Sequence, residues 1–93
     1  YVGSITIDSY LMEKAGLLKG ELVHVWNITN GQRLITYVIP GEAHSGTIQI
    51  NGSAAHRASP GDKIIIASFV QTDEPVQPKV VLVDDENRFV RFL

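Results

Sequence analysis

Residues 22–39 have the sequence LVHVWNITNGQRLITYVI, in which two runs of branched and aromatic residues flank a turn. Val, Ile, Thr, Tyr and Trp favour strands, and Asn30-Gly31 is a dipeptide that tight hairpin turns select because it tolerates a positive φ. The pattern predicts strands over residues 22–28 and 33–39. We therefore expect a mainly β fold.

Further short runs of the same composition lie before and after this stretch, and turn-forming residues separate them. They cover residues 1–7, 47–50, 63–70, 80–83 and 88–93. The expected turns are Pro40-Gly41, Asn51-Gly52, Pro60-Gly61-Asp62 and residues 84–87. Several short strands at regular spacing predict a closed barrel or a sandwich.

Two short helices are expected to interrupt the strands. Asp8 is a suitable cap for a helix that Gly16 and Gly20 end, and its apolar positions, three or four residues apart, are Leu11, Ala15 and Leu18. Residues 53–58 contain good helix formers before a proline and predict one or two helical turns. Residues 71–77 are polar and are expected to form a loop or a connection that interdigitates between strands.

The composition narrows the function classes. With 93 residues we expect a single domain over residues 1–93, and a core this thin favours an oligomer. A net charge of -2 without a basic block argues against nucleic acid as a partner. The absence of cysteine excludes thiolate chemistry. The longest apolar run, residues 64–70, is too short for a membrane helix, and no export signal opens the chain, so we expect a cytoplasmic protein.

Taken singly, the ionisable residues indicate little. The three histidines, His24, His44 and His56, lack the spacing of a metal site, so no metal is expected. On a strand Arg33 and Tyr37 share one face and Thr36 lies on the other. A cation and a phenol on one face suit a binding cleft, but an ordinary strand with a surface arginine explains the same pattern.

Four segments taken together resemble the aspartate 1-decarboxylase family. They are YVGS at residues 1–4, WNITNGQRLITY at 26–37, INGSAAH at 50–56 and PGDKIII at 60–66, and a similar KVVLVD segment follows at 79–84. The resemblance covers most of the chain. It implies a small double-psi β-barrel with short helices, assembled as a homotetramer with active sites between neighbouring subunits.

The resemblance also implies a self-made cofactor at Gly3-Ser4. In the family the precursor is a zymogen in which the Ser hydroxyl attacks the Gly carbonyl, and the cleaved enzyme carries a covalent pyruvoyl group, here derived from Ser4. That ketone forms a Schiff base with L-aspartate and releases CO₂ and β-alanine for pantothenate and coenzyme A synthesis, without a metal or pyridoxal phosphate. The sequence begins within an expected strand and without Met, so we expect a short upstream chain that comes from the same precursor and is not part of this sequence.

The roles of further residues follow from the same resemblance. Tyr37 matches the proton donor, and Arg33 matches the contact to the substrate carboxylate, which we expect to be the one that is retained. Thr36 matches a residue that contacts the substrate and assists cleavage. The remaining expected substrate-binding residues are Asn51, Gly52, Ser53 and Ala54.

Two other interpretations remain open at this stage. A double-psi barrel can also serve as a non-catalytic binding or assembly module, since a fold alone does not fix a function. The chain can also be an unprocessed proenzyme that needs an accessory protein to mature. Ser53 and Ala43-His44 depart from the residues usual in the family, and the sequence does not decide between aspartate and glutamate.

Overall fold

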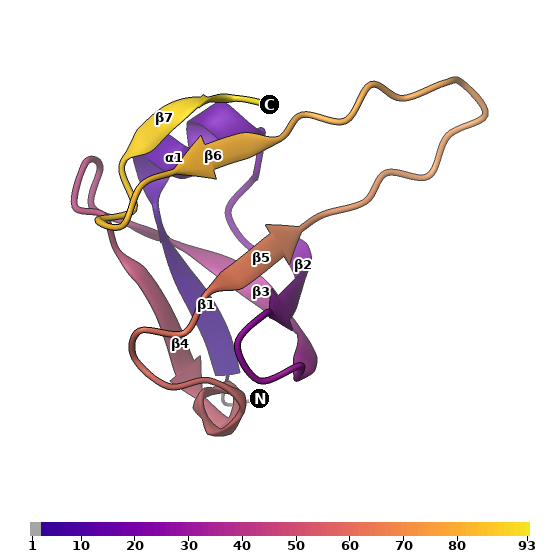
Figure 1. Ribbon diagram of the computed structural model, residues 1–93. Coiled ribbons are helices and arrows are strands. Elements are labelled where there is room, and N and C mark those ends of the chain that lie inside the picture. The colour runs from indigo at the N-terminus through magenta and orange to yellow at the C-terminus, as the bar shows by residue number, and fades with distance from the viewer. Residues whose placement is uncertain (1–2) are drawn as a thin grey trace.

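Strands make up most of the regular secondary structure in the computed structural model, which describes residues 3–93 (Figure 1). In chain order its elements are β1 (Gly3–Asp8), α1 (Ser9–Ala15), β2 (Leu22–Asn27), β3 (Arg33–Gly41), β4 (Ile48–Gly52), the 3₁₀ helix η1 (Ser53–Arg57), β5 (Ile64–Ala67), β6 (Val81–Val83) and β7 (Phe89–Phe92). The mainly β fold with short helices is confirmed. Tyr1 and Val2, part of the first expected strand, lie outside the described residues.

Five strands form one sheet in the order β4-β1-β3-β2-β5, and β6 and β7 form a separate hairpin. Strand β1 pairs with β4 in antiparallel and with β3 in parallel fashion. A parallel pair needs a crossover connection, which α1 and β2 supply here. Figure 1 shows the β6–β7 hairpin beside α1 at one end of the molecule and η1 at the opposite end. The two ends of β1 therefore have different surroundings.

The core lies on one face of the three inner strands. Alternate residues of β1, β2 and β3 are almost completely buried there, as the two-residue period of a strand requires, and α1 adds two more. The cluster consists of Ile5, Ile7, Leu11, Met12, Val23, Val25 and Val38. Burial of these side chains stabilises the position of β1 between β4 and β3.

Helix α1 begins where the sequence predicts and ends at the first of the two expected glycines, one turn before the expected helical position Leu18. The side chain of Asp8 accepts a hydrogen bond of 2.8 Å from the backbone N–H of Tyr10. Gly16 adopts a φ of 78°, the left-handed conformation that ends helices, and Leu18 lies beyond the helix. The 3₁₀ helix η1 likewise confirms the short helix expected over residues 53–58.

Two strand predictions need correction. Pro40-Gly41 was expected to be a turn, but both residues belong to β3, where Pro40 pairs with Ile7. On the β2 side, the N–H of Val38 donates to the Glu21 carbonyl oxygen and its C=O accepts from the N–H of Gly20. The pairing of β2 with β3 ends at Leu22 and Tyr37, so β3 has no strand partner on this side beyond Val38. The backbone N of Pro40 faces the same side as that of Val38, where β3 has no further strand partner, so the missing N–H removes no hydrogen bond from the sheet.

The strand expected over residues 63–70 ends earlier. Strand β5 stops at Ala67, which pairs with His24, and the two earlier residues of β2, Val23 and Leu22, pair with β3 alone. Residues 68–80 have no regular secondary structure, and Figure 1 shows them as a long loop that leaves the body of the protein. Its apolar side chains Phe69, Val70 and Val76 are exposed. The predicted loop at 71–77 is confirmed.

Within residues 3–93, none of the helices has the length and apolar character needed to cross a membrane.

Candidate functional site

Strand pairing brings the expected cleavage site and the expected substrate-binding segment together. Ser4 of β1 pairs directly with Asn51 of β4, and Gly3 pairs with Gly52. The two segments are almost fifty residues apart in the sequence. Their proximity follows from the antiparallel register of β1 and β4.

Ser4 lies in a buried polar environment. Only 4% of its surface is exposed, and its Oγ accepts a hydrogen bond of 2.9 Å from Asn51 Nδ2. The same Nδ2 also donates to Thr6 Oγ1 at 2.9 Å. A serine hydroxyl on a strand is more often solvated, so burial against an amide donor marks Ser4 as unusual in this sheet.

Strand β3 flanks Ser4 on the other side. The parallel register pairs Ile5 with Val38, and one residue further toward the start of each strand Ser4 is level with Tyr37. Because Ile5 and Val38 both face the core, Ser4 and Tyr37 share the opposite face of the sheet. Tyr37 is 39% exposed there.

Thr36 occupies the other face of β3. It is 5% exposed, and its Oγ1 has no hydrogen-bond partner among residues 3–93. By the same register Thr36 is level with Gly3. An orphaned buried hydroxyl costs free energy, so its presence beside the expected scissile bond calls for a functional reason.

The segment after Asn51 makes a sharp change of direction. Gly52 has a φ of 65° and a ψ of −146°, a conformation that side chains resist, and η1 begins at the next residue. Ala54 is buried, whereas Gly52 and Ser53 are exposed. The turn at Gly52 thus directs Ser53 and Ala54, the next two expected substrate-binding residues, back over the end of β1. The helix η1 contacts β1, β3 and β4.

Comparison with known proteins gives the family. The chain matches the family model described as aspartate decarboxylase over residues 1–90. It belongs to the aspartate decarboxylase family. Its strand arrangement is accordingly that of the small double-psi β-barrel predicted from the sequence.

Individual relatives agree with the family match. The chain is 58% identical to aspartate 1-decarboxylase 1 of Frankia casuarinae over 98% of its length. It is 51% identical to aspartate 1-decarboxylase of Chromobacterium violaceum over 95% of its length, and 53% identical to that of Corynebacterium efficiens over 97%. The chain spans 62%, 73% and 69% of these three relatives, respectively.

Arg33 lies apart from the other residues that the family resemblance selects. It shares the face of Tyr37 but is four residues away, which is about 13 Å along a strand. Its guanidinium carbon is 5.2 Å from the centre of the Trp26 ring, and both line a shallow cavity of about 280 Å³. Arg57 Nη1 donates to the Arg33 carbonyl oxygen at 2.8 Å and ties η1 to this end of β3. Within this one chain, Arg33 and Ser4 therefore occupy separate places on the sheet.

A second polar cluster, which the sequence did not reveal as such, surrounds Asp8 at the far end of β1. Oδ1 of this buried carboxylate accepts from the N–H of Tyr10 and of His44, and Oδ2 accepts from Gly46. Burial acts to raise the pKa of Asp8, but the backbone N–H donors outweigh it and lower the pKa below its usual value. The cluster ties α1 to the β3–β4 loop.

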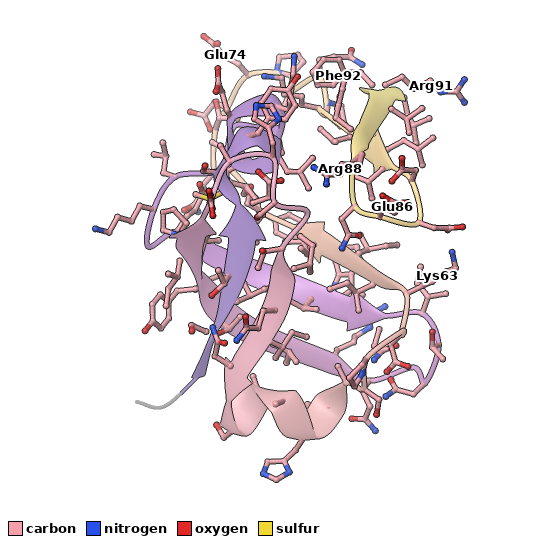
Figure 2. All side chains as sticks on the ribbon, turned by 90° about the vertical axis from the view of Figure 1, so that its left-hand side faces the viewer. Lys63, Glu74, Glu86, Arg88, Arg91 and Phe92 are labelled. Carbon is pink, nitrogen blue, oxygen red and sulfur yellow. The ribbon has the colours of Figure 1, made fainter. Side chains whose placement is uncertain are left out.

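The β6–β7 hairpin closes over this cluster. Figure 2 shows Arg88 pointing from the hairpin toward the body of the protein, where its guanidinium donates to the His44 carbonyl oxygen. Asn87 Nδ2 donates to the Gly46 carbonyl oxygen at 3.0 Å. The only sequence signal for this arrangement was the capping position of Asp8, because its other partners come from loops distant in the chain.

The histidines are dispersed as the sequence predicts. His24 lies near Trp26 and Phe69 on the outer face of the sheet, His44 stacks on Tyr10 and His56 is on η1. In the part of the chain that the structure describes, no three His, Asp or Glu side chains gather as metal ligands do.

Proposed function

We propose that this chain is the catalytic part of an aspartate 1-decarboxylase, which converts L-aspartate to β-alanine and CO₂ after it has cleaved itself between Gly3 and Ser4. The observation that carries the proposal is the surrounding of Ser4. Its buried hydroxyl accepts a hydrogen bond from Asn51, and an unpartnered Thr36 hydroxyl is level with Gly3 on the neighbouring strand.

Self-cleavage uses these groups in order. Ser4 Oγ attacks the Gly3 carbonyl carbon, and glycine leaves that carbon sterically open. Asn51 Nδ2 holds Oγ through a lone pair, so the hydroxyl proton is free to leave. The hydroxyl of Thr36 is available to donate to the Gly3 carbonyl oxygen as negative charge develops there, and this use explains why it has no other partner.

The residues around Ser4 suit the pyruvoyl group that the family implies. A carbonyl oxygen only accepts hydrogen bonds, and Asn51 Nδ2 is already a donor at the Ser4 side chain. When present, the pyruvoyl group supplies the carbonyl that accepts the electron pair released as the substrate carboxylate departs as CO₂. The donors on the same sheet face would be Asn51 and Tyr37, whereas Thr36 lies on the other face, level with Gly3.

Tyr37 is the proposed proton donor to the carbon that loses its carboxylate. Its phenol belongs to the same sheet face as Ser4 and is level with it, and its partial exposure gives the proton a route from solvent. Arg33 is the proposed contact to the retained carboxylate, which its planar guanidinium can hold through paired hydrogen bonds. Gly52, Ser53 and Ala54 complete the proposed substrate-binding set.

The separation of Arg33 from Ser4 supports a site shared between subunits. The outer face of the sheet carries exposed apolar side chains that a single chain leaves uncovered, namely Leu22, Ile35, Ile39, Ile65 and Phe69. A homotetramer that buries this face would bring Arg33 of one subunit to Ser4 of another. The upstream chain of the precursor is the second proposed partner, and the supply of β-alanine for pantothenate synthesis in the cytoplasm is the proposed role.

The test is an intact-mass measurement on the purified full-length translation product, before and after borohydride reduction in the presence of L-aspartate. We expect two chains, the larger starting at residue 4 without the mass of an amino-terminal serine and gaining a reduced aspartate adduct. Ser4→Ala should give one unsplit chain without an adduct. A wild-type chain that stays intact and gains no mass would overturn the proposal and favour a non-catalytic module or an unprocessed proenzyme.

A further inference from the structure

Asn51 is held from both of its amide atoms. Its Nδ2 donates to Ser4 Oγ and to Thr6 Oγ1, each at 2.9 Å, and its Oδ1 accepts from Gln49 Nε2 at 3.0 Å. All four side chains lie on one sheet face, because β4 pairs Asn51 with Ser4 and Gln49 with Thr6. The result is a continuous chain of hydrogen bonds that runs from Gln49 to the proposed nucleophile.

We infer that Gln49 is a positioning residue for self-cleavage, which acts by fixing the orientation of the Asn51 amide. The inference rests on the proposed function of Ser4 described above. An asparagine amide presents a donor on one side and an acceptor on the other, so a half-turn about its last torsion exchanges the two. In the observed orientation the donor faces Ser4 because the acceptor faces Gln49.

The orientation matters because of what happens to Ser4 Oγ. In the cleavage step Oγ bonds to the Gly3 carbonyl carbon, the C–N bond between Gly3 and Ser4 breaks, and the hydroxyl proton ends on the released amine of Ser4. Once that proton has left, Oγ is an ester oxygen that accepts hydrogen bonds but cannot donate one. Asn51 Nδ2 suits this oxygen throughout the step, whereas Oδ1 in its place would repel it.

Thr6 alone does not select the orientation. Its hydroxyl can donate as well as accept, so it pairs equally with either side of the Asn51 amide. Gln49 Nε2 supplies the donor for Asn51 Oδ1 in the orientation in which Asn51 Nδ2 faces Ser4, so Gln49 stabilises that orientation. Its side chain is exposed enough to change without disturbing the core. Gln49 touches neither the scissile bond nor Ser4, so its action passes through Asn51.

The sharpest perturbation is Gln49→Glu in the full-length chain. Glutamate has the same length and shape but, when ionised, only accepts hydrogen bonds, so it attracts Asn51 Nδ2 and turns Oδ1 toward Ser4. We expect the first-order rate of chain splitting at pH 7, followed by gel electrophoresis and intact mass, to fall about tenfold, as loss of the hydrogen bond from Asn51 to the reacting oxygen predicts. Gln49→Met, which removes the donor without adding an acceptor, should slow splitting by about two- to fivefold.

A pH profile separates positioning from general damage. Protonated glutamic acid can donate again, so the ratio of wild-type to Gln49→Glu splitting rates should return toward one as the pH falls through about 4.3. Gln77→Glu adds the same charge in the exposed loop and serves as the matched control with an unchanged rate. Trp26 fluorescence verifies folding at each pH.

Two results overturn the inference: splitting of Gln49→Glu at the wild-type rate, or a slowing that is the same at every pH. Failure of the proposed function has a different signature, because the wild-type chain itself would then not split. A normal wild-type chain beside an unaffected Gln49→Glu variant would leave the cleavage of Gly3-Ser4 intact and remove Gln49 from it.

Discussion

Asp8→Asn is the substitution whose effect on stability the structure specifies most closely. The side chain is 2% exposed and accepts three backbone hydrogen bonds, at 2.8 Å from Tyr10, 3.0 Å from His44 and 2.9 Å from Gly46. Asparagine keeps the oxygen that serves Tyr10 and His44. It places Nδ2 against the N–H of Gly46, where two donors face each other.

The loss in free energy of unfolding on Asp8→Asn follows from these contacts. Loss of the bond from Gly46 removes one charge-assisted hydrogen bond, worth about 1.5 to 3 kcal/mol, and leaves a buried donor without an acceptor at about 1 to 3 kcal/mol. The two contributions overlap, so we expect the free energy of unfolding to fall by about 2 to 4 kcal/mol. Against a typical stability of about 5 to 15 kcal/mol, this is a substantial fraction.

The pH dependence gives an independent check. Burial raises the pKa of Asp8 but the backbone N–H donors lower it more, so the folded-state pKa lies below the unfolded value of about 3.9. The carboxylate therefore stabilises the fold above the unfolded pKa, and this contribution is lost as the pH falls through the folded pKa. The difference between wild type and Asp8→Asn should be largest at neutral pH and should shrink below about pH 4.

Urea unfolding followed by the fluorescence of Trp26, the only tryptophan, measures both quantities. All variants are compared at one protein concentration, because assembly contributes to apparent stability. Asp73→Asn, in the exposed loop, is the matched control and should change the free energy of unfolding by less than about 0.5 kcal/mol. An equally small change for Asp8→Asn at pH 7, or a larger change without pH dependence, would refute the reasoning.

Two further substitutions separate cleavage from catalysis. Tyr37→Phe should split at the wild-type rate, because protonation of the substrate follows chain cleavage, but should release CO₂ from aspartate at least about a hundredfold more slowly. The control Tyr10→Phe should retain turnover, and an active Tyr37→Phe enzyme would remove the Tyr37 phenol from catalysis. Thr36→Val should slow splitting by about tenfold or more yet leave the free energy of unfolding unchanged or higher, since it replaces an unpartnered buried hydroxyl by a methyl group. Normal splitting of Thr36→Val, followed by intact mass, would contradict the role given to its hydroxyl.

The sequence predicted those parts of the fold that local chemistry determines. Asp8 and Gly16 delimit α1 because a cap and a left-handed residue act within a few positions. Pro40 was misjudged because its tolerance in β3 depends on where β2 ends, which is a property of the sheet rather than of the neighbouring residues. The early end of the strand at Ala67 was also missed, because residues 68–70 have the composition of a strand but do not pair with β2.

In the candidate site, too, the sequence indicated individual residues but not the contacts that depend on the sheet. The family resemblance selected Ser4 and Asn51, but nothing in their spacing indicates that they pair, because strand register is set by long-range packing. Gln49 escaped selection for that reason: its importance appears only once it is seen on the same face as Asn51. The distance between Arg33 and Ser4 also depends on the pairing of β3 with β1.

The interior position of β1, between β4 and β3, has a consequence for the product of the proposed cleavage. New chain ends usually fray, because the first residues after a cut lose half of their neighbours. Here the cut would fall at the first residues of a strand that has hydrogen-bonded partners on both sides, so the new terminus would start inside the sheet. The protein could thus break its own backbone while strand pairing with β4 still holds the resulting reactive end.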